Sequence, residues 1–483
     1  MATKDFIAAI ALGSSQVSGI AGRREADGSL HVLAYARAEA PQAISKGIVR
    51  NVERAAQAIT SIVSQLESQL GSRIARVYTG ISGQSLRTVE NVISRELPQE
   101  GVIPQKLVDD ISDENLQVPV AGMDVLDVAP QEWRIDQHTQ ADPVGAVGRE
   151  VTATFLNIVG RSELKRNLEL AYSQAGLEVA DLIVTPLATA LATLQESETR
   201  AGCALVDLGA ETTTVAVYQA GLLRYLSVIP LGGSHITRDL TTLRLVEPEA
   251  EQLKREQGDA LYVEPTAEQP ATCQTADGRT LQVADVCDIV GARAEEILAN
   301  VLHQISLSGY EGRLYAGIVL TGGASALRGL EDALRRLGKE RAEKVKTVLT
   351  PQVKLTGKAS LLPADGTATA LVGLMMRGHD DCRRPDEPQP EATAQPVAPA
   401  GATPAPAVDN TRPDTAPSRQ TPSASNGRDA GQGTSSPQPA QPTTRSSKKK
   451  PSKEKDPSKT SSKIFQMFGN FTGSLFDDDE FNQ

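Results

Sequence analysis

The chain has 483 residues, enough for two or more domains and a large buried core. Its formal net charge of −11 argues against a nucleic-acid-binding protein, because such proteins normally present a basic face. Four cysteines without zinc-site spacing, and the lack of any apolar run near the roughly 18 residues of a membrane span, favour a cytoplasmic protein.

The first predicted elements are two short strands joined by a glycine turn. An apolar run leads into Gly13, Ser14 and Ser15, and a second apolar run follows. Small residues in such a turn let backbone N–H groups approach an anion closely. The turn is therefore a candidate phosphate loop, and residues 30–38 are expected to add a further strand.

A helix and another strand come next. Apolar residues at helical spacing predict a helix over 52–70 that Gly71 ends, and residues 74–81 fit a strand. From 84 to 157 short strands alternate with Pro and Gly breaks around one helix, near 106–116. We interpret this segment as a small inserted α+β subdomain, with two separate strands at 123–129 and 131–136.

Two helices are predicted before the centre of the chain. Ser162 is expected to cap the first, and Gly176 to end it. The second, at 187–194, begins near Pro186 and consists mostly of small residues. Small side chains allow close packing, which suits a helix between two halves of a protein.

A second glycine turn lies at the centre of the chain. Asp207 enters it, Gly209 forms it, and Thr212 and Thr213 leave it, between two strand-like runs. A carboxylate that holds a metal-bound water beside hydroxyl and amide donors suits a nucleotide's phosphates. An ordinary hairpin in a buried sheet would have the same pattern.

The two turns share one plan, which indicates an internal duplication. Aligning Gly13 with Gly209 places Ala11 opposite Asp207. We therefore expect two related α/β halves, each presenting a phosphate hairpin to a cleft between them. A third loop, with the pair Gly322 and Gly323 after an apolar strand, suits contact with a base or ribose.

Two further helices are expected in the second half. One, at 247–258, is highly charged and brings Glu251 and Lys254 onto the same face, where spacing alone favours a solvated ion pair. The other is long and covers 283–308.

The composition changes after residue 378. Residues 379–444 are mostly Pro, Ala, Gln, Thr, Ser, Gly and Asp, a composition typical of a disordered linker. Residues 445–463 are strongly basic, and 464–483 contain five of the chain's seven phenylalanines. At helical spacing this tail has an apolar face, which predicts an amphipathic helix lying in an anionic membrane surface. The predicted membrane-binding residues are Ile464, Phe465, Met467, Phe468, Phe471 and Leu475.

Several longer motifs resemble the FtsA family of bacterial cell-division proteins, within the actin-like ATPase superfamily. They are Pro130-Gln-Glu-Trp-Arg-Ile-Asp-Gln, Asp142-Pro-Val-Gly145, Ile229-Pro-Leu-Gly-Gly-Ser-His and the Thr321-Gly-Gly loop. The resemblance covers about 1–378 and implies an actin-like, two-lobed, duplicated α/β fold. It assigns 1–83 and 158–200 to lobe 1, 84–157 to the inserted subdomain, and 201–378 to lobe 2.

The resemblance also implies ATP and Mg²⁺ as ligands, with Asp207 holding the metal through water. The implied nucleotide-binding residues are Gly13, Ser14, Ser15, Asp207, Gly209, Thr212, Thr213, Gly232, Gly233, Glu251, Lys254, Gly322 and Gly323. Residues 240–310 would bind the C-terminal peptide of FtsZ, with Arg293 as a charged contact. Implied partners are FtsZ, further copies of the chain, other division proteins and the inner face of the cytoplasmic membrane.

Three residues depart from the family's pattern. The first loop normally carries an acid at Ala11 and a lysine at Gln16, and the second has glycine at Glu211. These changes should weaken metal positioning, so we expect at most a weak ATPase. A sugar-kinase-type phosphotransferase and a pilus-assembly adaptor remain alternatives, although a kinase needs an intact acid set.

Overall fold

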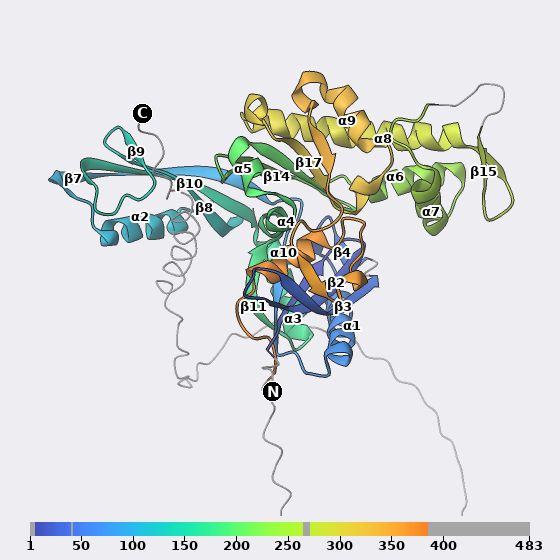
Figure 1. The fold of residues 1–483 in the computed structure, drawn as a ribbon, viewed down its shortest axis with the longest axis horizontal. Helices are drawn as coiled ribbons and strands as arrows, with labels where there is room; N and C mark the ends of the chain where they lie inside the picture. Colours follow the sequence, from blue (N-terminus) through green and yellow to red (C-terminus); the bar gives the residue numbers. More distant parts are fainter. Residues whose placement is uncertain (1–4, 40–41, 264–270, 385–483) are drawn as a thin grey trace, which may run out of the picture. The chain divides into compact units, whose positions relative to one another are not determined.

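The computed structural model describes residues 5–39, 42–263 and 271–384 (Figure 1). The predicted linker, the basic segment and the membrane-binding tail lie outside the described residues. None of the helices in the described part of the chain is long and apolar enough to cross a membrane.

The first half of the chain builds a six-stranded sheet. Its order is β11 (Glu178–Val184), β6 (Arg76–Ile81), β1 (Ile7–Leu12), β2 (Gln16–Arg24), β3 (Leu30–Glu39) and β19 (Leu355–Gly357). Helix α1 (Val52–Leu70) has the predicted bounds because Asn51 caps its first turn and Gly71 adopts the left-handed conformation after its last. The helix packs closely on β2, where Gly19 leaves room for Ile62 and Leu66.

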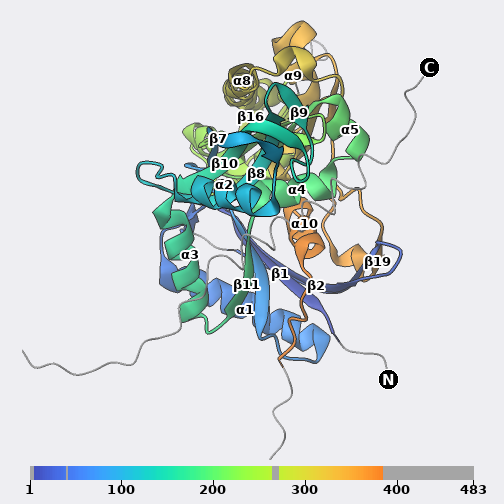
Figure 2. The ribbon, with the colours of Figure 1, turned by 90° about the vertical axis from the view of Figure 1, so that its left-hand side faces the viewer.

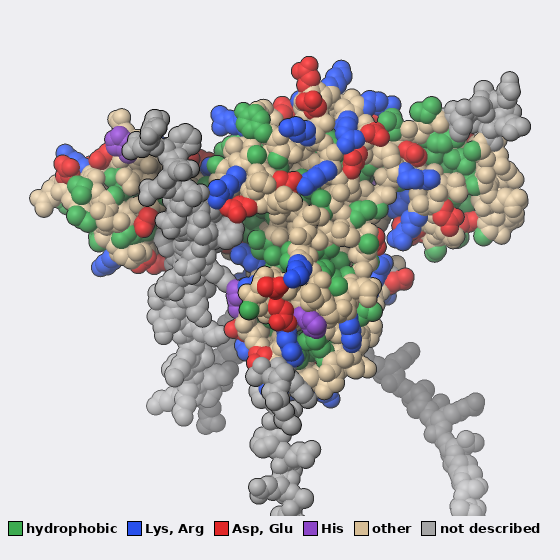
Figure 3. Space-filling model, viewed as in Figure 1, with side chains coloured by type: hydrophobic (Ala, Val, Ile, Leu, Met, Phe, Trp, Pro, Cys, Tyr) green, Lys and Arg blue, Asp and Glu red, His purple; other side chains and the backbone are tan. Residues whose placement is uncertain are grey.

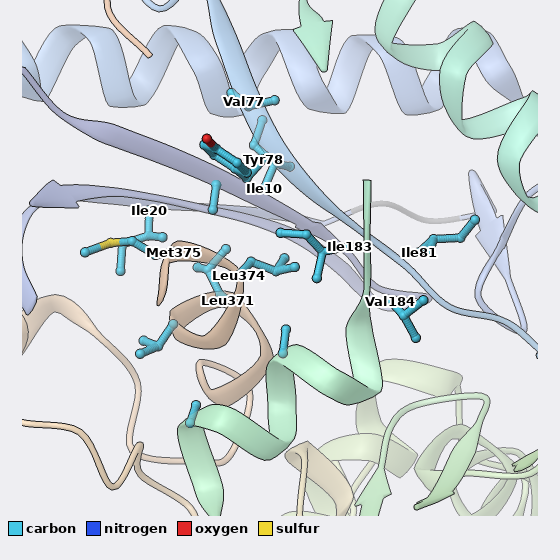
Figure 4. Packing of buried hydrophobic residues seen from close by; sticks show 14 of the residues in the cluster. Ile10, Ile20, Val77, Tyr78, Ile81, Ile183, Val184, Leu371, Leu374 and Met375 are labelled. Atoms are coloured by element: carbon cyan, nitrogen blue, oxygen red, sulfur yellow. The ribbon is translucent and has the colours of Figure 1, made fainter. Parts of the chain in front are cut away.

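The opposite face of this sheet is covered by α4 (Thr185–Thr193) and α10 (Thr369–Arg377). Figure 4 shows Leu371, Leu374 and Met375 of α10 pointing toward the sheet that carries Ile10 and Ile20. Strand β19 and helix α10 thus pack with the first sheet. The prediction that all of 201–378 belongs to lobe 2 was wrong for these two elements.

A second sheet of nine strands forms the core of the other lobe and continues into the insert. Its order is β18 (Val345–Thr347), β17 (Gly317–Thr321), β12 (Cys203–Leu208), β13 (Thr213–Gln219), β14 (Leu222–Ile229), β7 (Arg87–Val102), β10 (Val147–Arg161), β8 (Met123–Ile135) and β9 (His138–Gln140). The helices of this lobe include α6 (Gly233–Leu240), α7 (Glu247–Gln257), the long α8 (Val283–Leu307) and α9 (Leu330–Gly338). The smaller elements include α5 (Glu196–Ala201) and the hairpin of β15 (Thr272–Gln274) and β16 (Thr280–Gln282).

The insert is an α+β unit with its own core, as predicted. Helix α2 (Gln105–Gln117) packs on β7, β8 and β10 (Figure 2). Trp133 and Phe155 meet edge to face in this core, with ring centroids 6.0 Å apart. The pairing of Ser227 on β14 with Arg87 on β7 joins the insert to the second sheet.

Two local predictions failed for identifiable reasons. The expected break at Pro130 is absent, because a register shift opposite Thr154 and Phe155 lets β8 continue through the proline. Ser162 is the first residue of α3 (Ser162–Gln174) and not its cap, since its hydroxyl donates to Asp124 at 2.6 Å.

The described chain ends in a segment fixed to the first sheet. The hydroxyl of Tyr78 accepts the N–H groups of His379 and Asp380, at 3.0 and 2.9 Å. Cys382 N–H then donates to the carbonyl of Phe6, at 2.8 Å, and Arg384 N–H to that of Arg73, at 2.9 Å. We call residues 378–384 the exit segment.

Candidate functional site

The two glycine turns have the same structure. Gly13 N–H donates to the carbonyl of Gln16 at 2.9 Å, and Gly209 N–H donates to that of Thr212 at 2.8 Å. A Cβ atom at either glycine would lie about 3 Å from that same carbonyl oxygen, which is tighter than ordinary contact. The predicted duplication therefore extends to the turns themselves, and each turn requires glycine for the same reason.

Both turns present backbone N–H groups without acceptors. In the described part of the chain, no hydrogen bond is donated by the N–H groups of Ser14 and Ser15 in the first turn. The same holds for Ala210, Glu211 and Thr212 in the second. Successive N–H groups in a turn form a concave site for anions, so both turns fit a polyphosphate.

A cavity of about 50 Å³ separates the second turn from the first lobe. It is lined by Ser82, Thr185, Pro186, Asp207, Gly209, Thr212 and Thr214. It is large enough for water but far below the roughly 300 Å³ at which ligand pockets begin. The cavity is thus a water-sized part of the candidate site.

Asp207 is the carboxylate at this cavity. It is the second-last residue of β12, and burial raises its pKa to about 6. Nothing in the described chain donates a hydrogen bond to it, and any side chain at Gly322 would collide with its Oδ1 atom. An unpaired carboxylate beside a water-sized cavity is suited to hold a cation through water.

The described residues contain no cluster of three or more His, Cys, Asp or Glu side chains able to hold a metal. A magnesium ion here would thus depend on Asp207, water and phosphate oxygens, which is a usual arrangement for this cation. The oxygen Oε1 of Gln16, next to the first turn, is buried with no hydrogen-bond partner in the described structure.

Gly232 and Gly233, also predicted to bind nucleotide, hold the second turn in place. Gly233 N–H donates to the carbonyl of Gly209 at 3.0 Å, and Ser234 N–H to that of Ala210 at 2.8 Å. A Cβ atom at Gly232 would lie 2.5 Å from the Gly209 oxygen. The N–H of Gly232 in turn donates a hydrogen bond to His235 Nδ1 at 3.1 Å. Burial keeps the pKa of His235 below its ordinary value.

Glu251 and Lys254 form a partly buried network where spacing alone indicated a solvated pair. Lys254 Nζ, whose side chain is 12% exposed, lies 2.5 Å from Glu251 Oε2. It also donates to Thr237 Oγ1 at 2.9 Å and to the carbonyl of Gly233 at 3.1 Å. Burial lowers the pKa of Lys254. Because all three of its protons are used, Lys254 positions Gly233 in this structure.

The third loop meets the second at Asp207. Gly322 has a φ of +87° and packs on both Asp207 and Gly366, while Gly323 lies against Thr367. No N–H of Gly322, Gly323 or Ala324 donates to a described acceptor. The structure thus brings the second and third loops together and adds the 366–367 turn to them.

The sequence analysis missed a hairpin that touches both glycine turns. It consists of β4 (Ile44–Ser45) and β5 (Ile48–Val49), joined by Lys46 and Gly47. Lys46 N–H donates to Glu211 Oε2 at 2.5 Å, and Gly47 N–H to Ser14 Oγ at 3.1 Å. A two-residue Lys-Gly turn between two short segments that each contain isoleucine is a recognisable hairpin signal, although a weak one.

Arg293, the predicted partner contact, is bound within the chain. Its Nε and Nη2 atoms lie 2.6 and 3.2 Å from the carboxylate of Asp239 on α6, and it also pairs with Glu296.

A groove of about 300 Å³ lies between α8 and α9. It is lined by Ala260, Glu295, Leu298, Ala333, Arg336, Leu337 and Lys339. Basic and acidic side chains alternate on the face seen in Figure 3 without forming one basic surface.

Comparison with known proteins agrees with this architecture. The family model described as "Cell division protein FtsA" matches residues 204–365, and "SHS2 domain inserted in FTSA" matches 83–159. The chain is 31% identical to the FtsA protein of Porphyromonas gingivalis, over 68% of this chain and 70% of that protein. It is 29% identical to that of Pseudomonas aeruginosa, over 67% and 79%.

Among solved structures, the chain resembles one titled "PilM-PilN type IV pilus biogenesis complex", with a TM-score of 0.54. That likeness, at 20% identity over 77% of this chain and 98% of the other, concerns the fold alone. The two-lobed α/β fold is actin-like, and the insert is the one found in FtsA proteins. The chain therefore belongs to the FtsA family of cell division proteins.

Proposed function

We propose that this chain is a division adaptor that binds adenine nucleotide with Mg²⁺ and tethers FtsZ filaments to the inner face of the cytoplasmic membrane. The observation that carries the nucleotide site is the pair of turns with the same hydrogen bond and with unpaired N–H groups, one of them beside the Asp207 cavity. Membership of the FtsA family favours an adaptor over a sugar kinase.

Turnover of ATP should be slow or undetectable, because only one turn carries a carboxylate. Ala11 pairs with Ser18 in the first hairpin as Asp207 pairs with Thr214 in the second, so the two positions correspond. The variant Ala11→Asp supplies the missing acid and is expected to raise phosphate release above that of the unchanged protein. Multiple turnovers per second by the unchanged protein would contradict the proposal.

Membrane attachment is assigned to the tail at 464–483 from its sequence. Burying a phenylalanine side chain in an apolar phase contributes roughly 1.5–3 kcal/mol, and each Lys or Arg near an anionic surface about 1 kcal/mol. The basic residues at 445–463 would therefore assist the apolar face carrying Phe468 and Phe471. The acidic run at 477–480 would be repelled and mark the end of the contact.

Co-sedimentation of the full chain with anionic vesicles tests the membrane assignment. The double variant Phe468→Glu with Phe471→Glu should lose vesicle binding at least about tenfold, because two buried side chains exceed the 1.4 kcal/mol of one decade. Phe481→Glu, beyond the acidic run, is the matched control and should sediment as the unchanged protein does. If the double variant binds vesicles fully, the tail is not the anchor.

The same assay addresses the partner. FtsZ should sediment with vesicles only when this chain is present, and FtsZ lacking its C-terminal peptide should remain in solution. Arg293 on α8 is already paired with Asp239, so it is not the main contact that we propose for this peptide. The groove between α8 and α9 is the more suitable place for a short peptide. Recruitment of the truncated FtsZ would place the contact elsewhere.

A further inference from the structure

The β4–β5 turn connects the two phosphate turns through hydrogen bonds of its own backbone. Lys46 N–H donates to the Glu211 carboxylate on the second turn, and the adjacent Gly47 N–H donates to Ser14 Oγ on the first. Glu211 comes from the second lobe and Lys46 from the first. The pair is thus a direct link across the cleft.

The turn is closely packed against its surroundings. Lys46 and Gly47 have φ values of 50° and 75°, and a non-glycine residue in this left-handed region carries a steric cost. A Cβ atom at Gly47 would lie 2.7 Å from the Cα atom of Gly83, so the turn packs directly against the segment that follows β6. Such packing keeps the two N–H groups directed at the phosphate turns.

The group that Lys46 N–H meets is an anion. A carboxylate accepting a backbone N–H uses the same charge-assisted hydrogen bond that a phosphate oxygen would use. Glu211 also lies in the turn whose unpaired N–H groups, at 210–212, fit a phosphate. The side chain therefore places a negative charge beside the predicted phosphate site.

We propose that Glu211 acts as an internal substitute for the terminal phosphate and makes the site selective for a nucleoside diphosphate over a triphosphate. The proposal rests on the nucleotide site proposed above. A third phosphate would have to displace the carboxylate from Lys46 N–H or lie next to its charge. A nucleoside diphosphate neither displaces the carboxylate nor lies next to its charge, so the hydrogen bond between Glu211 and Lys46 that links the lobes stays intact.

Calorimetric titration of the full chain with ADP and with ATP, both with Mg²⁺, tests the proposal. The unchanged protein should bind ADP at least about tenfold more tightly than ATP. Glu211→Gln keeps an oxygen that accepts Lys46 N–H but removes the charge, so its ATP and ADP affinities should approach each other. Glu53→Gln, which removes an exposed acid at the start of α1, is the control and should keep the original ratio.

Hydrogen exchange without nucleotide tests the link itself. Glu211→Ala removes the acceptor, so the Lys46 amide should exchange faster by at least about tenfold, whereas Glu211→Gln should retain most of its protection. Equal exchange in all three proteins would overturn the link.

The titration separates the two proposals. An ATP-to-ADP affinity ratio that Glu211→Gln leaves unchanged overturns the role of Glu211 alone. Weaker ATP binding by that variant also overturns it, because it would identify Glu211 as a metal ligand. Absence of nucleotide binding by every variant would overturn the nucleotide site and this inference with it.

Discussion

At the scale of single residues, the buried carboxyl of Asp207 is expected to lower the free energy of unfolding at neutral pH. The folded chain holds this carboxyl at the cavity with a pKa near 6, against 3.8 for the free group. The folded state therefore retains a proton between about pH 4 and 6 that the unfolded state loses. Stability should fall as the pH rises through that window, and above pH 6 the charged carboxylate costs the folded state its full penalty.

Replacing Asp207 by Asn should remove that cost. The variant is expected to unfold with a free energy about 1–3 kcal/mol higher at pH 8, from the size of the pKa shift, and to gain less at pH 4. It should also lose Mg²⁺-dependent nucleotide binding. Denaturant titration at both pH values, with calorimetry for the nucleotide, gives the two readouts. A variant less stable at pH 8 would show that the carboxylate has a stabilising partner.

The sequence predicted the position of those turns whose residues lie in continuous motifs. Gly13, Gly209 and Asp207 could be located because turn chemistry is local. The hairpin of Lys46 and Gly47 could not be placed, because its partner Glu211 lies 165 positions away. The full pairing of Lys254 could not be predicted either, since helical spacing gives neighbours on one helix and not the contact with Thr237 on another.

At the scale of elements, α4 and α10 make a close contact through their backbones. Gly373 of α10 faces the backbone of α4, and a Cβ atom there would collide with the carbonyl of Ala188. The small residues at 187–194 led us to expect such a close contact, although the sequence did not reveal its partner. A helix–helix contact made by backbone cannot be relieved by a change of rotamer.

Gly373→Ala should therefore destabilise the protein even though alanine favours helix. Overpacking a core typically costs 1–3 kcal/mol, and we expect about 2 kcal/mol here by denaturant unfolding. Gly312→Ala is a matched control, because a Cβ atom at Gly312 meets open space at an ordinary φ. The control should change the free energy of unfolding by less than about 0.5 kcal/mol. If both variants are equally stable, the two helices are free to move apart.

At the scale of the whole described molecule, the chain returns to its first sheet near its end. Strand β19 pairs with β3 after more than 300 intervening residues, so the first lobe is completed only by the last elements. The periodic pattern predicted most helices and strands, because it depends on neighbours in sequence. It could not assign β19 and α10 to a lobe, since parallel pairing over such a separation leaves no local trace.

The position of α10 has a mechanical consequence. The helix begins at Thr369, whose hydroxyl binds the carbonyl of Gly366 beside the third loop, and ends at the exit segment. A pulling force applied to the chain beyond Arg384 would act first on the hydrogen bonds that the exit segment makes with Tyr78, Phe6 and Arg73. These bonds would share the force. Only a force that breaks them would reach α10 and draw on the Gly366 turn. The hydrogen bonds of the exit segment should thus keep tension on the tail from opening the cleft.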